Sequence, residues 1–347
     1  MTFQAYLTAV MQAVNSSGDH RAALFVAQEV DPPNNQQLTT FLGILDTIIA
    51  TETKKSGLGA KETAQVDARR DAIGLILNFV HTGPVTGAFS HIDRNIFCFQ
   101  LALRVRRPKI IDQDQTTLCG PVALVVDVAK RDPVKYVRMA LDLFETGRAY
   151  WGTKELAPGI IVRQGYNRLT PKADYIVLAS IRDAWAIILE SDTIRNIFTL
   201  TKPGALCQFL EDAGYTEVMD RTFFNMTTPL KILDAITPHP LHGQNHQPGD
   251  RGIKSLRLAE QEMSIGRSVV LNAAGTLSHI IGGDPAVPAP GPIDPAATHW
   301  TLLRKLTFIG TTHVAVRLIT WGGARQRTIP LNVFLSYYCG YVSANPG

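Results

Sequence analysis

The stretch QDQTTLCGPVAL at residues 113–124 contains residue types that acyl transfer by a cysteine requires. Cys119 stands directly before Gly-Pro and an apolar run, which is typical of a helix that begins at the cysteine, because Pro121 lacks an N–H that the first turn leaves unpaired. The positive end of a helix dipole favours the thiolate, the nucleophilic form of cysteine. Gly120 is expected to leave space beside the sulfur for a substrate carbonyl. The alternative is a small buried cysteine at the start of a core helix.

An acyl-transfer intermediate also needs hydrogen-bond donors directed at its oxyanion. A side-chain amide upstream of the cysteine can join the backbone N–H of Cys119 in this role. Gln113, six residues before Cys119, is the first candidate for it, and Gln115 is the reserve.

A cysteine nucleophile needs a base, which is usually a histidine distant in the sequence. Of the 9 histidines, His299 follows the long loop GGDPAVPAPGPIDPAAT and begins a predicted strand, so that its side chain is expected at the rim of a sheet. Trp300 begins the alternation of inward and outward residues along that strand. His313 also begins a predicted strand and is the second candidate.

The elements that must position these residues can be predicted from hydrophobic periodicity. Helical spacing of apolar residues predicts three amphipathic helices over residues 3–14, 38–49 and 66–80, which form a small bundle with a structural or docking role. The turn-rich segment 81–95 is interpreted as a linker. A further helix over 131–147 is predicted with Asp132 as its cap and Gly147 as its stop.

The remainder of the chain changes from helices to strands. More helices are predicted at 172–189, 201–214 and 252–266. Runs rich in β-branched and aromatic residues, separated by Gly-containing turns, predict consecutive antiparallel strands. These runs cover 267–274, 299–309, 313–321 and 325–331, and a short helix at 332–338 with a last strand at 340–344 closes the sheet.

Length and composition indicate the class of protein. The 347 residues suggest two domains, and 45% apolar with 18% charged residues are typical of a soluble globular protein. A formal net charge of +4 is too small to argue for nucleic acid. We expect no membrane span, no secretory signal and synthesis in a cytoplasm, with export by a system that needs no cleaved signal left open. The 4 cysteines lie far apart, which favours reduced thiols over disulfides or a zinc site.

Taken together, Gln113, Cys119-Gly120-Pro121, His299 and TWGG at 320–323 resemble papain-like cysteine peptidases, particularly a bacterial branch similar to the bacteriocin-leader peptidases. The resemblance covers about residues 95–347. It implies an α+β, papain-like fold, with a helical lobe that carries the nucleophile helix and an antiparallel β-sheet lobe, preceded by an α-helical N-terminal domain at 1–94. It also implies Cys119 as nucleophile, His299 as general base and acid, Gln113 as oxyanion donor, and Gly120, Trp300 and Trp321 as residues that line the cleft.

The third catalytic residue of that family departs from the pattern. Ile319 stands where the family has an asparagine, and residues 295–347 contain no Asp or Glu. A neutral side chain can still fix the tautomer of His299, with a loss in stabilisation of the imidazolium. The candidates for this role are Thr320, Gln326, Asn332 and Asp294.

Two further groups of residues have alternative interpretations. His239, His242 and His246 lie in one loop with only Asp250 close in sequence, and we interpret this loop as exposed and polar rather than as a metal site. The last predicted strands carry basic residues that either face solvent or mark an acidic partner: Arg304, Lys305, Arg317, Arg325 and Arg327.

The sequence therefore predicts a cysteine protease that needs no cofactor and no metal, and that acts as a bacterial effector or toxin on proteins of a target cell. Its expected partners are a protein or peptide substrate and a cognate immunity or inhibitor protein, with no nucleic acid and no membrane. Two alternatives stay open. One is an amidase, deamidase or transferase on the same residues, such as a peptidoglycan amidase, and the other is a non-catalytic binding protein on a degenerate peptidase fold.

Overall fold

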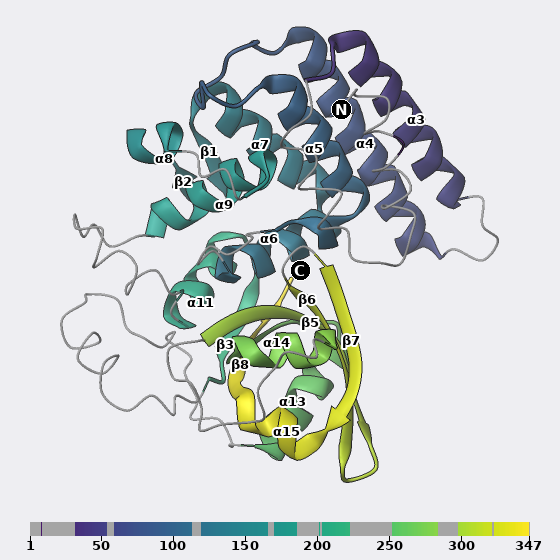
Figure 1. Ribbon diagram of the computed structural model, residues 1–347, viewed down its shortest axis with the longest axis vertical. Coiled ribbons are helices and arrows are strands. Elements are labelled where there is room, and N and C mark those ends of the chain that lie inside the picture. Colours follow the sequence, from purple (N-terminus) through teal and green to yellow (C-terminus); the bar gives the residue numbers. More distant parts are fainter. Residues whose placement is uncertain are drawn as a thin grey trace. The chain divides into compact units, whose positions relative to one another are not determined.

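The computed structural model of the protein describes residues 8, 32–53, 59–112, 119–165, 170–185, 201, 203–222, 252–283, 298–320 and 323–346. The chain folds into two compact units (Figure 1). Unit 1 comprises Met1–Thr116, Val125–Ala186 and Trp321–Gly323, and unit 2 comprises Thr117–Leu124, Ile187–Thr320 and Ala324–Gly347.

Unit 1 is built mainly from helices that pack against one another. Its longer helices are α3 (Asn35–Thr53), α4 (Ala60–Thr82), α5 (Arg94–Arg106), α7 (Pro133–Thr146) and α9 (Lys172–Trp185). Smaller elements are η1 (Pro108–Ile110), α8 (Ile160–Gln164) and a hairpin of β1 (Ala149–Trp151) and β2 (Lys154–Leu156). Helix α4 packs against α3, α5 and α7, and α9 packs against α5 and α7.

The predicted helices of unit 1 are confirmed where the structure describes them. Leu38, Leu42 and Leu45 on α3 are buried, as the helical spacing requires. Asp132 caps α7 by accepting a hydrogen bond of 2.9 Å from the Lys135 N–H, and Gly147 ends the helix with a φ of 70°, where glycine has no steric cost. The predicted helix at 3–14 lies outside the described residues apart from one position.

Helix α5 was not predicted, because it is buried on every side and has no polar face. Its core positions include Gln100 and Arg104, so its sequence lacks the alternation of apolar and polar residues that marks a surface helix. Asp93 begins the helix by accepting hydrogen bonds from the N–H groups of Asn95 and Ile96. The domain boundary predicted after residue 94 falls inside unit 1, where α4 packs against α5 and α7, and that boundary stays a prediction.

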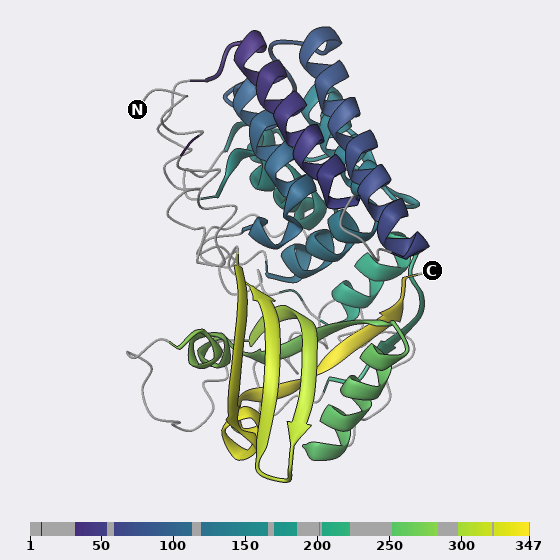
Figure 2. The ribbon, with the colours of Figure 1, turned by 90° about the vertical axis from the view of Figure 1, so that its right-hand side faces the viewer.

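Unit 2 contains a six-stranded sheet in the order β3-β8-β4-β5-β6-β7 (Figure 1). Its strands are β3 (Thr216–Asp220), β4 (Ser268–Ala274), β5 (Thr298–Ile309), β6 (His313–Thr320), β7 (Gly323–Pro330) and β8 (Tyr338–Asn345). The pairs β3–β8, β4–β8, β4–β5 and β5–β6 are antiparallel. Figure 2 shows the yellow-green strands β5, β6 and β7 side by side. All strands except the short β3 were predicted.

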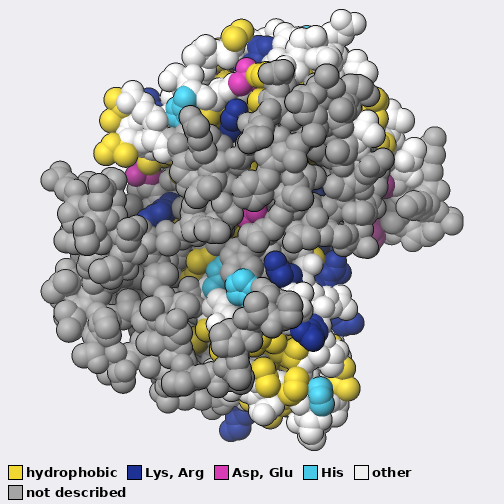
Figure 3. Space-filling model, viewed as in Figure 1, with side chains coloured by type: hydrophobic (Ala, Val, Ile, Leu, Met, Phe, Trp, Pro, Cys, Tyr) yellow, Lys and Arg dark blue, Asp and Glu magenta, His cyan; other side chains and the backbone are white. Residues whose placement is uncertain are grey.

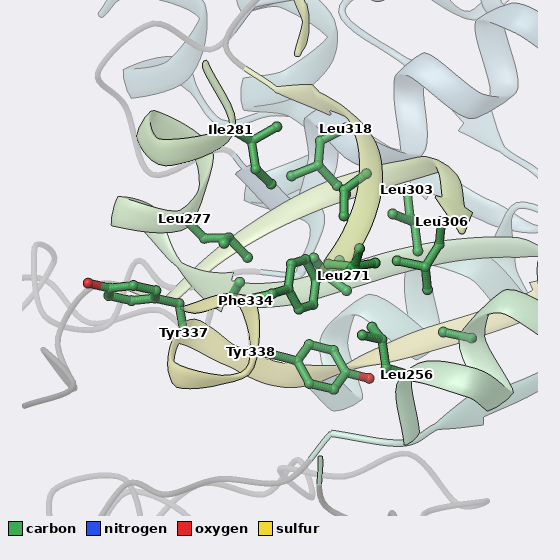
Figure 4. Close-up of a cluster of buried hydrophobic side chains, with 14 of the residues drawn as sticks. Leu256, Leu271, Leu277, Ile281, Leu303, Leu306, Leu318, Phe334, Tyr337 and Tyr338 are labelled. Atoms are coloured by element: carbon green, nitrogen blue, oxygen red, sulfur yellow. The ribbon is translucent and has the colours of Figure 1, made fainter. Parts of the chain in front are cut away.

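Three helices supply apolar side chains to the core of the sheet. Unit 2 carries α11 (Pro203–Asp212), α13 (Ile253–Ser264), α14 (Gly275–Gly282) and α15 (Leu331–Tyr337). Leu256 of α13, Leu277 of α14 and Phe334 of α15 pack with Leu271 of β4 and Leu318 of β6 in one buried cluster (Figure 4). This core holds β4, β5 and β6 in place and therefore supports the ends of these strands.

Helix α6 (Cys119–Arg131) belongs to both units, because its first residues lie in unit 2 and the rest in unit 1. The combination of helices with an antiparallel sheet confirms the α+β class. Among the residues that the structure describes, no helix is both long and apolar enough to cross a membrane.

Candidate active site

Cys119 is the first residue of α6, as the Cys-Gly-Pro pattern predicted. Its side chain is 4% exposed, and the apolar residues that follow it are buried as well, among them Val122, Leu124 and Val126. The burial of this face anchors the helix, and therefore the position of the cysteine at its start. Cys119 belongs to unit 2, together with the sheet.

His299 lies at the start of β5, where it is paired with Ala273 on β4. The side chain is 8% exposed. Burial, the larger cause, and the nearby charge of His279 on α14 together lower the pKa of His299 from 6.5 to about 4. His299 is therefore neutral at pH 7, which is the form that can accept a proton.

Thr320, the last residue of β6, is the hydrogen-bond partner of His299. The Nε2 atom of the imidazole lies 2.5 Å from the Thr320 hydroxyl oxygen, and both side chains are buried. Among the candidates that the structure describes, Thr320 thus contacts the imidazole. Asn332 is exposed on α15, where its backbone carbonyl accepts a hydrogen bond from Ser336, and Gln326 is exposed on β7.

Thr201 contacts the residue that follows Cys119 and also the residue that follows His299. The indole N–H of Trp300 donates a hydrogen bond of 2.7 Å to the backbone carbonyl of Thr201. A Cβ atom on Gly120 would lie 2.5 Å from side-chain atoms of Thr201. The start of α6 and the start of β5 therefore meet at one residue, within unit 2.

These contacts change the roles expected for two residues. Thr201 occupies the space beside Gly120 that was expected to serve a substrate carbonyl, so glycine is needed here for close packing. Trp300 was expected to line the cleft, but its side chain is 2% exposed and its N–H is bound to Thr201. Both residues hold the site together in this geometry.

His313, the second candidate for the base, lies at the other end of the β5–β6 hairpin. It is paired with Ile309 next to the turn, whereas His299 is the second residue of β5. Its side chain is exposed, and its Nδ1 atom is 3.0 Å from the hydroxyl of Thr312. Because the strands are antiparallel, the length of the hairpin separates His313 from Thr320 and His299.

Several predicted site residues lie outside the described residues: Gln113, Gln115, Asp294, Trp321, His239, His242 and His246. The residue before Gln113 is nevertheless well anchored in unit 1. The backbone N–H of Asp112 donates to the Asp174 carboxylate at 3.0 Å, and the same carboxylate forms a fully buried ion pair with Arg104 at 2.6 Å.

Sequence reasoning did not identify Thr201 or His279. No local pattern connects residue 201 with residues 120 and 300, because their contact depends on how the chain folds. His279 lies on the short helix α14, which was not predicted, and its effect on His299 depends on spatial proximity.

The described residues contain no group of three or more His, Cys, Asp or Glu side chains that could hold a metal ion. The described part of the site offers the thiol of Cys119, the imidazole of His299 and the hydroxyl of Thr320. Comparison of the chain with models of protein families, with curated proteins and with solved structures finds no match.

Proposed function

We propose that the protein is a cysteine peptidase with a papain-like architecture, in which Cys119 is the nucleophile and His299 the general base and acid. The observation that carries this proposal is the shared contact at Thr201. The side chain of Thr201 packs against Gly120, and its carbonyl accepts a hydrogen bond from Trp300. Each of these residues directly follows one of the two proposed catalytic residues.

The proposed reaction is hydrolysis of a peptide bond through a thioester. His299 takes the proton of the Cys119 thiol, and the thiolate attacks the carbonyl carbon of the substrate. The backbone N–H of Cys119 and the side chain of Gln113 stabilise the oxyanion. His299 then protonates the leaving amine, and water, activated by the neutral imidazole, hydrolyses the thioester.

Thr320 assigns a role to each nitrogen of the imidazole. When the Thr320 hydroxyl accepts a hydrogen bond from Nε2–H, the lone pair of the neutral ring lies on Nδ1. In the proposal, Nδ1 takes the proton from Cys119. A hydroxyl fixes the tautomer and the orientation of the ring, but it stabilises the imidazolium less than a carboxylate does.

The proposed substrate is a protein or peptide, and the proposed setting is a bacterial effector or toxin acting on proteins of a target cell. The setting rests on the family resemblance of Gln113, Cys119-Gly120-Pro121 and His299. An amidase, deamidase or transferase would use the same thioester with another substrate or acceptor.

A non-catalytic binding protein is the second candidate. The neutral partner of His299 favours it, because a threonine hydroxyl offers little stabilisation to the charged imidazole that catalysis requires. The two candidates differ in the reactivity that they predict for the Cys119 thiol.

Alkylation by iodoacetamide at pH 6 tests the activated cysteine, and the other cysteines provide internal controls. Burial raises the pKa of Cys98 to about 12 and that of Cys339 to about 11, so these thiols should react slowly. Mass spectrometry of the native protein is expected to find Cys119 alkylated first. If Cys119 reacts no faster than the thiol of a short peptide, the thiol is not activated. If Cys119 loses its faster labelling in His299→Gln, the activation is due to the histidine.

The peptidase activity itself is tested by comparing cleaved N-termini in cells that express the wild type or Cys119→Ala. New N-termini that appear only with the wild type support the proposal. An identical set in both would exclude a protease and leave an amidase, a transferase or a binding protein.

A further inference from the structure

The strands next to the candidate site are rich in basic residues. The sequence of 263–283 and 298–346 contains no Asp or Glu, whereas β5, β6 and β7 carry five Lys and Arg residues. These are Arg304, Lys305, Arg317, Arg325 and Arg327. Figure 3 shows dark blue side chains gathered over the region of β7, with cyan histidine side chains beside them.

Two of these arginines lie on β7 and reach toward α14. The Nη1 atom of Arg327 donates a hydrogen bond of 2.9 Å to the backbone carbonyl of Ile280. The guanidinium of Arg325 lies directly against Gly282, because a Cβ atom at that position would collide with it. A guanidinium has five N–H donors, so that the bond to Ile280 leaves Arg327 able to bind a further acceptor.

Helix α14 brings this charge close to the proposed base. It carries the exposed His279, whose charge lowers the pKa of His299. Strand β7 is close in sequence to the candidate site. It begins at Gly323, three residues after Thr320, which is the hydrogen-bond partner of His299. The side chains of Arg325 and Arg327 on β7 and of His279 on α14 thus lie at the border of the region around His299, and we call these three residues the basic border.

Strand β7 is also the last strand of the sheet on its side. Among the described strands it has β6 as its neighbour, and the sheet order ends with it. An edge strand presents backbone N–H and C=O groups with which an extended polypeptide can pair. The sequence of β7, GARQRTIP, contains no aromatic side chain on which a nucleic-acid base could stack.

We propose that the substrate of this site is an acidic, extended polypeptide, which pairs with β7 and places carboxylates against Arg325, Arg327 and His279. This inference rests on the proposed function and adds the chemical class of the substrate. A purely structural role for the arginines, in which they cap the C-terminus of α14 and keep the edge strand soluble, predicts no preference for acidic peptides.

Binding can be measured without turnover on the full-length Cys119→Ala protein. The probe is a short fluorescein-labelled peptide with glutamate at alternate positions, and its comparison is the same peptide with glutamine. Fluorescence anisotropy should show at least about tenfold tighter binding of the glutamate peptide, and this preference should weaken as salt is added. Equal affinity of the two peptides at low salt would overturn the proposal.

Charge removal distinguishes the basic border from the general charge of the sheet. The double variant Arg325→Gln, Arg327→Gln is expected to lose most of the tenfold preference, and Arg325→Lys, Arg327→Lys to keep most of it. The matched control removes the same charge at Lys305 and Arg317, which are exposed and face each other on β5 and β6. An equal loss in the control would show that only net charge matters, which contradicts the proposal.

Two further results separate this inference from the proposed function. Wild-type protein that cleaves glutamine and glutamate peptides equally well would refute the acidic substrate and keep the peptidase. Tight binding of the glutamate peptide by a protein that cleaves nothing would keep the basic border and refute the peptidase.

Displacement of the peptide by a single-stranded oligonucleotide at lower concentration than by the unlabelled peptide would reassign the border to nucleic acid. If the glutamine double variant does not fold, the comparison of the two peptides on Cys119→Ala still decides.

Discussion

The Nε2 atom of His299 lies 2.5 Å from the hydroxyl oxygen of Thr320, between the start of β5 and the end of β6. The two residues are 21 positions apart in the sequence and are brought together by the antiparallel β5–β6 hairpin. This contact gives the imidazole a defined orientation and a neutral partner. It makes Thr320 the first residue at which the proposed mechanism can be tested without removing the nucleophile or the base.

Replacing Thr320 by valine removes the hydroxyl with little change in shape. Loss of one hydrogen bond that orients the proposed base should lower kcat/KM about tenfold or more, with the smaller part of the effect in KM. Thr320→Ser keeps the hydroxyl and should retain most of the activity. Steady-state kinetics on a cleavable peptide measure both variants. Equal activity of the valine and serine variants would mean that the hydrogen bond does not serve catalysis.

Stability should fall as the pH is lowered from about 6.5 toward about 4, because of His299. The pKa of His299 is lower in the folded state, so in this range the unfolded chain takes up a proton that the folded protein does not. The contribution of neutral His299 to the free energy of unfolding is fully present above pH 6.5, and about 3 kcal/mol of it is lost by pH 4.

Urea unfolding of the wild type and of His299→Gln across this pH range measures the effect. Glutamine does not titrate, so the difference in free energy of unfolding between the two proteins should shrink as the pH falls. A difference that stays constant from pH 7 to pH 4.5 would contradict a depressed pKa in the folded protein.

Gly120→Ala introduces a Cβ atom 2.5 Å from side-chain atoms of Thr201. The start of α6 or Thr201 must then move, which should destabilise the protein by about 1–3 kcal/mol and lower activity. The control is Gly74→Ala in α4, where a Cβ meets nothing within 4 Å and alanine favours the helix. Thermal unfolding and peptide cleavage compare the two. Full activity of Gly120→Ala would argue against close packing at Thr201 as a requirement of the site.

Asp174→Asn leaves the fully buried guanidinium of Arg104 without its counter-charge. Removing one partner of a buried ion pair costs about 3–5 kcal/mol, and here the Asp112 N–H keeps only a weaker acceptor. The control is Asp46→Asn, because Asp46 pairs with Arg70 at the surface of unit 1, where solvent screens the pair and its loss should change stability little. Similar losses in both variants, measured by chemical denaturation, would contradict the importance of burial.

Much of the fold could be predicted because local patterns reflect it. The runs of β-branched and aromatic residues in β4, β5 and β6 and the cap and stop of α7 are properties of neighbouring residues, and these elements are found where predicted. Helix α5 escaped prediction because its burial on all sides removes the apolar stripe, and β3 because five residues give little pattern.

The sequence by itself determined that Cys119 begins a helix and that His299 begins a strand, since proline at the first turn and β-branched runs act locally. Only the tertiary structure decided what surrounds them. It brought Thr320, one of the four candidates, into contact with His299, joined Gly120 and Trp300 at Thr201, and brought His279 close enough to affect the imidazole. These contacts depend on strand register and on packing between segments far apart in the chain, and no short-range pattern encodes either of them.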